Sequence, residues 1–131
     1  TDSHISLNPL AEFRMMDYRQ RLISHRRNTF DGDAAQYMVN TAYRQGKLAM
    51  GIQHSNHFAP GQPMDAVIYD AEAPLIKRRN TTNRLATLLY TSDPSGIIGT
   101  MVSGKWVVKN NQHISGPTIR ENFLSALKDL R

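Results

Sequence analysis

Apolar residues recur at roughly helical spacing in the first part of the chain, at Leu10, Phe13, Met16, Leu22 and Ile23. The preceding pair Asn8-Pro9 favours a helix start, because Asn can cap free amides and Pro fits the first helical position. We therefore predict a helix from Pro9 to about His25. Asp17 and Arg21 lie four residues apart and are expected to pair on its solvent-facing side.

A second helix is predicted after the break at Asp31-Gly32-Asp33. Asp33 can cap this helix, and Gly46 is typical of a C-terminal stop. Small, polar and apolar residues fill the segment between them, at Ala34, Ala35, Tyr37, Met38, Thr41 and Ala42. Residues 48–52 could form one more helical turn beyond the stop.

The sequence pattern changes after Gln53. Residues 54–63 form a polar loop that contains Pro60-Gly61, and residues 64–70 are typical of a strand. Residues 74–84 are a polar and basic connection. Residues 85–90 are apolar, and their periodicity is compatible with either a strand or a short buried helix.

Two strands, at residues 97–102 and 105–109, are separated only by Ser103-Gly104 and predict a β-hairpin. Asn110-Asn111 predicts a second turn. The capping-box pattern from Thr118 to Glu121 then predicts a terminal helix. Its apolar face would consist of Ile119, Phe123, Leu124, Leu127 and Leu130.

The chain has 131 residues, of which 40% are apolar and 21% charged, and this suits one domain or parts of two. No window approaches the roughly 20 apolar residues of a membrane-spanning helix. Cysteine is absent, which excludes disulfides, a thiolate zinc site and a cysteine nucleophile. We expect a soluble protein in a reducing compartment, the cytoplasm.

Sixteen Lys and Arg residues against eleven Asp and Glu give a formal net charge of +5. A basic balance can indicate nucleic acid or an anionic membrane as partner. Here the basic residues form two short clusters, at 19–27 and 77–79, with Asp17, Asp31 and Asp33 close to the first. No zinc-finger spacing or aromatic RNA-binding run accompanies them. We therefore expect solvated faces, with neither nucleic acid nor a membrane bound.

The candidate chemistry is concentrated at the start of the chain. Asp2 and His4 are two residues apart, so in an extended segment both side chains point to the same side, as a metal ligand and its hydrogen-bonding neighbour would. The alternative is a frayed terminal carboxylate beside a surface imidazole. His54 and His57 are three residues apart, but Ser55-Asn56 between them favours ordinary loop histidines.

Several motifs resemble one enzyme family. The opening run Thr1-Asp2-Ser3-His4-Ile5-Ser6-Leu7 and the later Tyr18-Arg19-Gln20-Arg21-Leu22 look like the C-terminal portion of formimidoylglutamate deiminases, which are members of the amidohydrolase superfamily. The segments at 61–70 and 101–108 are similar to a late strand and a tryptophan-containing hairpin of that superfamily. The resemblance spans almost the whole chain.

The resemblance implies an α/β protein: the C-terminal part of a (β/α)8 metal-dependent hydrolase barrel, with its last strand and helices in residues 1–57. A small β-rich outer domain with the terminal helix would occupy residues 58–131. Asp2 would stand at the C-terminal end of the eighth strand, help to hold a catalytic zinc, or another divalent metal, and shuttle a proton, with His4 orienting Asp2 or lining the pocket. The implied reaction is hydrolysis of the formimino group of N-formimidoyl-L-glutamate to N-formyl-L-glutamate and ammonia, a step of histidine degradation.

A full barrel takes roughly 250 residues, and no His-x-His pair of the first strand is present. We expect the chain to begin inside a longer protein, to be inactive alone, and to have a small-molecule substrate and the missing N-terminal barrel as partners. Uncovered apolar faces favour a homo-oligomer. The alternatives are another amidohydrolase-superfamily deaminase or chlorohydrolase, and a non-catalytic basic interaction module.

Overall fold

The chain divides into two compact units. The computed structural model describes residues 7–53, 58–77 and 80–130. The helical unit comprises the described residues up to 53 together with 70–96, and the sheet unit comprises 58–69 and 97–130. Residues 70–96 therefore belong to the helical unit, although they lie between the two segments of the sheet unit along the chain. The assignment of residues 1–57 to a barrel end and 58–131 to an outer domain stays a prediction.

The first predicted helix is confirmed as α1 (Pro9–Ser24). The Asn8 side chain accepts a hydrogen bond from the Leu10 amide at 3.1 Å, and His25 ends the helix in the left-handed conformation at φ 52°. The prediction of its faces is wrong. Asp17 is buried, while Met16, Leu22 and Ile23 are exposed. Burial of Asp17 is possible because polar groups of other segments surround it, which helical periodicity does not reveal.

The second helix, α2 (Ala34–Ala49), is capped by Asp33 as predicted, with its carboxylate accepting a hydrogen bond from the Gln36 amide at 2.8 Å. The predicted stop at Gly46 is wrong. The Gly46 carbonyl accepts a helical hydrogen bond from the Met50 amide at 3.1 Å, so the helix continues for one further turn. The left-handed residue that follows the helix is Gly51, at φ 74°.

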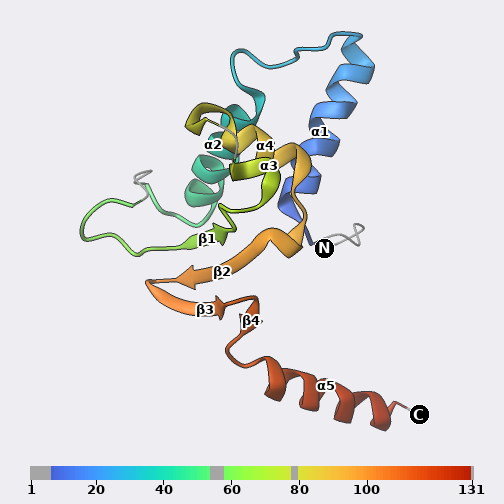
Figure 1. Ribbon diagram of the computed structural model, residues 1–131, viewed down its shortest axis with the longest axis vertical. Helices are drawn as coiled ribbons and strands as arrows, with labels where there is room; N and C mark the ends of the chain where they lie inside the picture. Colours follow the sequence, from blue (N-terminus) through green and yellow to red (C-terminus); the bar gives the residue numbers. More distant parts are fainter. Residues whose placement is uncertain (1–6, 54–57, 78–79, 131) are drawn as a thin grey trace. The chain divides into compact units, whose positions relative to one another are not determined.

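The apolar segment whose structure the sequence left open is helical. It forms α4 (Arg84–Thr91), and the preceding connection holds two short turns, α3 (Pro74–Lys77) and η1 (Thr81–Asn83), that the sequence analysis missed. Buried Leu89 packs with Ala35 and Met38 of α2 to form the core of the helical unit, which α1, α2 and α4 surround (Figure 1). The partly buried residues around this core are Phe13, Phe30, Ala34, Val39, Leu85, Ala86 and Tyr90.

The sheet unit contains four antiparallel strands in the order of the chain, as Figure 1 shows. They are β1 (Ala66–Tyr69), β2 (Ile97–Val102), β3 (Lys105–Lys109) and β4 (Gln112–His113). The predicted hairpin is confirmed, because Ser103 and Gly104 join β2 to β3 with φ angles of 48° and 76°, as a type I′ turn requires. Asn110-Asn111 forms the predicted second turn and leads into β4.

The terminal helix α5 (Gly116–Asp129) begins before the predicted capping box. Ser115 is its N-cap residue and makes no side-chain capping bond, so the interpretation of Thr118 as the cap is wrong. The apolar face of α5 is exposed, with Ile119 and Phe123 both more than half accessible. In the described part of the sheet unit only Gly99 is fully buried, so this unit has no dry core of its own.

The chain is therefore α/β, as expected, with helices and a four-stranded antiparallel sheet. Among the residues that the structure describes, no helix combines the length and apolar character needed to cross a membrane.

We predict that Gly99→Ala destabilises the sheet unit. A Cβ at this position would lie 2.6 Å from Cζ3 of Trp106, so the indole must shift and lose part of its contact. We expect the free energy of unfolding to fall by about 1–2 kcal/mol. Urea unfolding measures the loss, and the fluorescence of Trp106, the one tryptophan, should shift to longer wavelength.

Gly46→Ala is the matched control, because nothing lies within 4 Å of its added Cβ and it occupies a helix interior. It should raise the free energy of unfolding by up to about 1 kcal/mol. Equal stability of the two variants would contradict the packing of Trp106 against Gly99.

Candidate functional site

The carboxylate of Asp17 is only 1% exposed and contacts groups from three segments of the helical unit. Tyr90 of α4 donates a hydrogen bond to Oδ2 at 2.6 Å, and the Thr29 hydroxyl donates to Oδ1 at 3.3 Å. Arg21, one helical turn after Asp17, forms an ion pair in which its Nη2 lies 2.6 Å from Oδ2. Its Nε also donates a hydrogen bond to Oδ1 at 3.2 Å. One carboxylate therefore joins α1, the loop that follows it, and α4.

The Arg21 guanidinium also contacts two aromatic rings. Its central carbon lies 5.9 Å from the ring centroids of both Tyr18 and Tyr90. The two rings lie 6.4 Å apart, centroid to centroid. Such positions over a ring face favour a cation, so both rings stabilise the guanidinium of the Asp17–Arg21 pair. We call Asp17, Arg21, Thr29 and Tyr90 the Asp17 cluster.

The electrostatics of the Asp17 cluster favour a structural role. Burial, and then the hydrogen bond to the Asp17 carboxylate, raise the pKa of the Tyr90 phenol to about 12. Tyr90 therefore stays protonated near neutral pH and acts as a donor. Among the described residues that are not exposed, no buried side-chain nitrogen or oxygen lacks a hydrogen-bond partner. The hydrogen bonds of the Asp17 cluster join α1, the loop after it and α4.

A recess of about 210 Å³ lies beside the Asp17 cluster and reaches the N-terminal end of α2. Arg27 and Asn28 add polar groups to its wall, and Asp33 adds a carboxylate. Two arginines and two aspartates line the recess, so the formal charges of its wall cancel. The recess selects no class of charged ligand.

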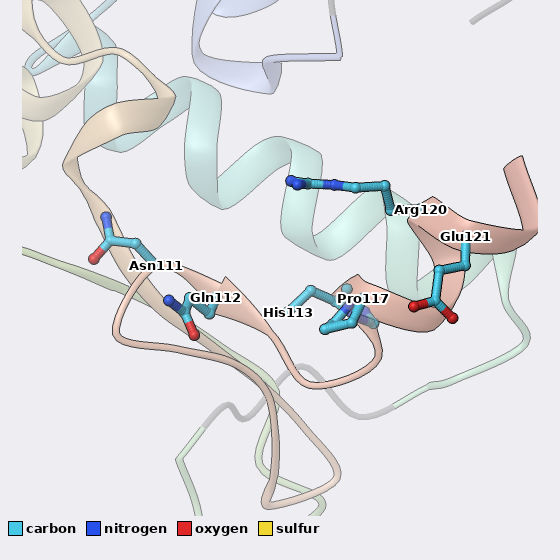
Figure 2. Close-up of a pocket in the computed structure, with 7 residues that line it drawn as sticks. Asn111, Gln112, His113, Pro117, Arg120 and Glu121 are labelled. Atoms are coloured by element: carbon cyan, nitrogen blue, oxygen red, sulfur yellow. The ribbon is translucent and has the colours of Figure 1, made fainter. Parts of the chain in front are cut away.

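A larger pocket, of about 570 Å³, lies where β4 leads into α5 (Figure 2). Its lining residues are Asn111, Gln112, His113, Gly116, Pro117, Arg120 and Glu121. The Nδ1 atom of His113 accepts a hydrogen bond from the Ser115 amide at 3.1 Å. Arg120 and Glu121 carry opposite charges, and the lining side chains are exposed, so this pocket gives a charged group little desolvation.

The residues that the sequence singled out for catalysis and metal binding, Asp2 and His4, lie outside the described residues, as do His54 and His57. Their proposed roles stay predictions. The described residues include no group of three or more His, Asp or Glu side chains placed to hold a metal. The spacing of Asp17 and Arg21 predicted their pairing, but no local pattern indicated Tyr90, because 73 residues separate it from Asp17.

We predict that Asp17→Asn lowers the free energy of unfolding by about 2–3 kcal/mol, because it removes a buried charge on which three donors converge. Asp31→Asn is the control, since Asp31 is an exposed carboxylate in the same region, and its effect should stay within about 0.5 kcal/mol. Chemical denaturation of both variants measures the difference. An Asp17→Asn variant as stable as the control would show that the carboxylate does not hold these segments together.

The raised pKa of Tyr90 predicts a loss of stability in alkali. A phenol whose pKa is higher in the folded state than in the unfolded state stabilises the fold below pH 10, and this contribution disappears as the pH rises toward 12. Absorbance titration of the five tyrosines should show late ionisation of Tyr90, and Tyr90→Phe should remove this component while leaving that of Tyr69, whose pKa burial also raises. Ionisation of all five tyrosines near their ordinary pKa would contradict the proposed burial.

Comparison with known proteins adds a relative. No family model matches the chain. A formimidoylglutamate deiminase of Pseudomonas aeruginosa is 28% identical over 134 residues, which cover 99% of this chain. The chain spans only 29% of the length of that relative. The resemblance predicted from the motifs is confirmed: over almost its whole length, the chain is similar to the C-terminal portion of a formimidoylglutamate deiminase.

Proposed function

We propose that the chain is the C-terminal part of a metal-dependent enzyme that hydrolyses the formimino group of N-formimidoyl-L-glutamate to N-formyl-L-glutamate and ammonia. The similarity to a formimidoylglutamate deiminase, which extends through both structural units, is the observation that carries this proposal. An enzyme of this kind serves histidine degradation.

The proposal gives the described residues a scaffold role and assigns the chemistry to the start of the chain. Asp2 would contribute one ligand to a zinc ion, with His4 beside it as a pocket residue. When bound, zinc lowers the pKa of water toward neutrality. Asp2 would take the proton that the attacking water releases and deliver it to the departing nitrogen, as a carboxylate within hydrogen-bond reach can.

This chain would share the metal site with the rest of the protein. Catalytic zinc sites use about three protein ligands and one open position. Because the sequence contains no His-x-His pair of the kind that such enzymes place on their first strand, the further ligands would come from polypeptide outside this chain. We therefore propose that the 131 residues are inactive alone and that the helical unit forms the end of a (β/α)8 barrel.

Another deaminase or chlorohydrolase of the amidohydrolase superfamily is the second candidate. Such enzymes would share the motifs at strand β1 and at the Trp106 hairpin. Neither motif contacts a substrate in this proposal, so these motifs do not distinguish the two candidates. At 28% identity, the residues that select the substrate can differ between relatives.

We predict zinc-dependent release of ammonia from N-formimidoyl-L-glutamate by the full-length protein. Asp2→Asn should reduce kcat by about 10²–10⁴, because the amide cannot carry the proton. Asp31→Asn, an exposed carboxylate in a loop, is the control and should leave kcat unchanged. The release of ammonia by the unmodified full-length protein and by each of the two variants is measured with and without a chelator.

Hydrolysis of N-formimidoyl-L-glutamate by the 131-residue chain alone would refute the proposal that the metal site is shared with the rest of the protein. Faster hydrolysis of a cyclic amidine or a chlorinated ring by the full-length protein would favour the second candidate instead.

A further inference from the structure

The irregular connection between α1 and α2 (Figure 1) carries an exposed pair of residues, Asp31-Gly32. Gly32 has a φ angle of 75°, in the left-handed region, and nothing lies within 4 Å of the position that a Cβ would occupy. Glycine suits this turn because a side chain would be strained there. In the whole sequence this is the one place where glycine follows an Asp or Asn residue.

The two groups of this pair that can react with each other are both accessible. Among the described residues, none donates a hydrogen bond to the Asp31 carboxylate and none accepts one from the Gly32 amide. Because glycine has no side chain, nothing at the second position blocks the approach of the amide nitrogen to Cγ of Asp31. The turn therefore places an unshielded amide directly after a mobile, exposed carboxyl group.

We propose that Asp31-Gly32 is a site of isoaspartate formation, that the isoaspartyl form loosens the start of α2, and that this form is a substrate for an isoaspartyl methyltransferase. The Gly32 nitrogen attacks Cγ of Asp31 and forms a new N–C bond. The carboxyl group loses its hydroxyl, which leaves as water together with the amide proton, and a cyclic succinimide remains.

Water then opens the succinimide at one of its two carbonyls. Cleavage of the new bond restores aspartate. Cleavage of the original peptide bond leaves the chain running through Cβ and Cγ of residue 31, with a free α-carboxylate. No electrons are transferred and no co-reactant other than water is needed.

Asp33, two residues later, has the same carboxyl group in a protected setting. Its carboxylate accepts a hydrogen bond from the Gln36 amide at 2.8 Å, as the cap of α2. The residue that follows it, Ala34, has a side chain and begins the helix. A carboxylate held by a capping bond is not free to meet the next amide. We therefore expect the reaction at one of two neighbouring aspartates.

The isoaspartyl form has one more main-chain carbon between two fixed points of the loop. Before it, the Thr29 hydroxyl donates to the Asp17 carboxylate at 3.3 Å, and after it Asp33 caps α2. The Asp33 cap is exposed, whereas Asp17 is buried. The added carbon should therefore displace the cap and leave the Asp17 cluster in place.

The free α-carboxylate of the product is the group that an isoaspartyl methyltransferase esterifies. The methyl group passes from the sulfonium of S-adenosylmethionine to a carboxylate oxygen. Methanol then leaves as the succinimide forms again, and water opens it. An exposed irregular loop suits such an enzyme, because a loop fits an active site with little rearrangement of the fold.

Ageing of the full-length protein at neutral pH tests the proposal. Fragmentation of the tryptic peptide 28–44 by electron transfer assigns isoaspartate to Asp31 or Asp33. Transfer of labelled methyl from S-adenosylmethionine by a purified isoaspartyl methyltransferase measures the same product independently. A synthetic peptide of residues 26–36 gives the rate in the absence of the fold.

We expect Asp31 to react in the folded protein less than about tenfold more slowly than in the peptide, and Asp33 to react at least about tenfold more slowly than Asp31. A greater slowing of Asp31 would overturn the proposal, because it would show that the fold protects this pair. A smaller difference between the two aspartates would also overturn it. Isoaspartate that the methyltransferase leaves unmodified would refute the proposed substrate role.

Two variants of the same position act in opposite directions. Asp31→Glu keeps the charge and should abolish the reaction, because the corresponding ring has six members and forms far more slowly. Asp31→Asn should react faster than the unmodified protein, because ammonia leaves more readily than water does from a carboxylate. The unfolding and activity measurements on this variant therefore use freshly purified protein.

Hydrogen exchange tests the effect on α2. The amides of Gln36 and Tyr37 donate to the side chain and to the carbonyl of Asp33, at 2.8 and 3.0 Å. In the isoaspartyl form they should exchange about tenfold or more faster, whereas the amides of α5 should be unchanged. Treatment with the methyltransferase should reverse the difference. A smaller increase, or an equal increase in α5, would overturn the proposed loosening of α2. None of these results depends on deiminase activity.

Discussion

The helical unit depends on a single buried charge. The carboxylate of Asp17 binds Arg21 on its own helix, Thr29 in the following loop and Tyr90 on α4. An unpaired charge at this depth would cost several kcal/mol, so the native arrangement is one in which all three groups reach the same carboxylate. This requirement turns the face of α1 that carries Asp17 toward α4 and the loop that follows α1.

The two units are stabilised in different ways. The helical unit has a small dry core of Ala35, Met38 and Leu89 next to the Asp17 cluster. The sheet unit relies on its strand ladder, on two turns with left-handed residues and on the contact between Trp106 and Gly99. Both units leave large apolar side chains exposed.

In the proposed enzyme, the described residues have a structural role and the catalytic residue lies elsewhere in the chain. Among the described residues that are not exposed, the buried polar groups satisfy one another and hold the scaffold together. The proposed chemistry falls to Asp2, which precedes α1 along the chain.

The sequence alone determined the elements whose causes are local. Asn8 and Asp33 as helix caps, the hairpin at Ser103-Gly104 and the turn at Asn110-Asn111 all follow from the conformations that these residues favour. Its motifs also identified the relative. The tertiary structure decided what depends on distant residues: the helical state of 84–91, the continuation of α2 through Gly46, and the burial of Asp17. Tyr90 lies 73 residues from Asp17, so no local pattern could show that a charge four residues from Arg21 would face the interior.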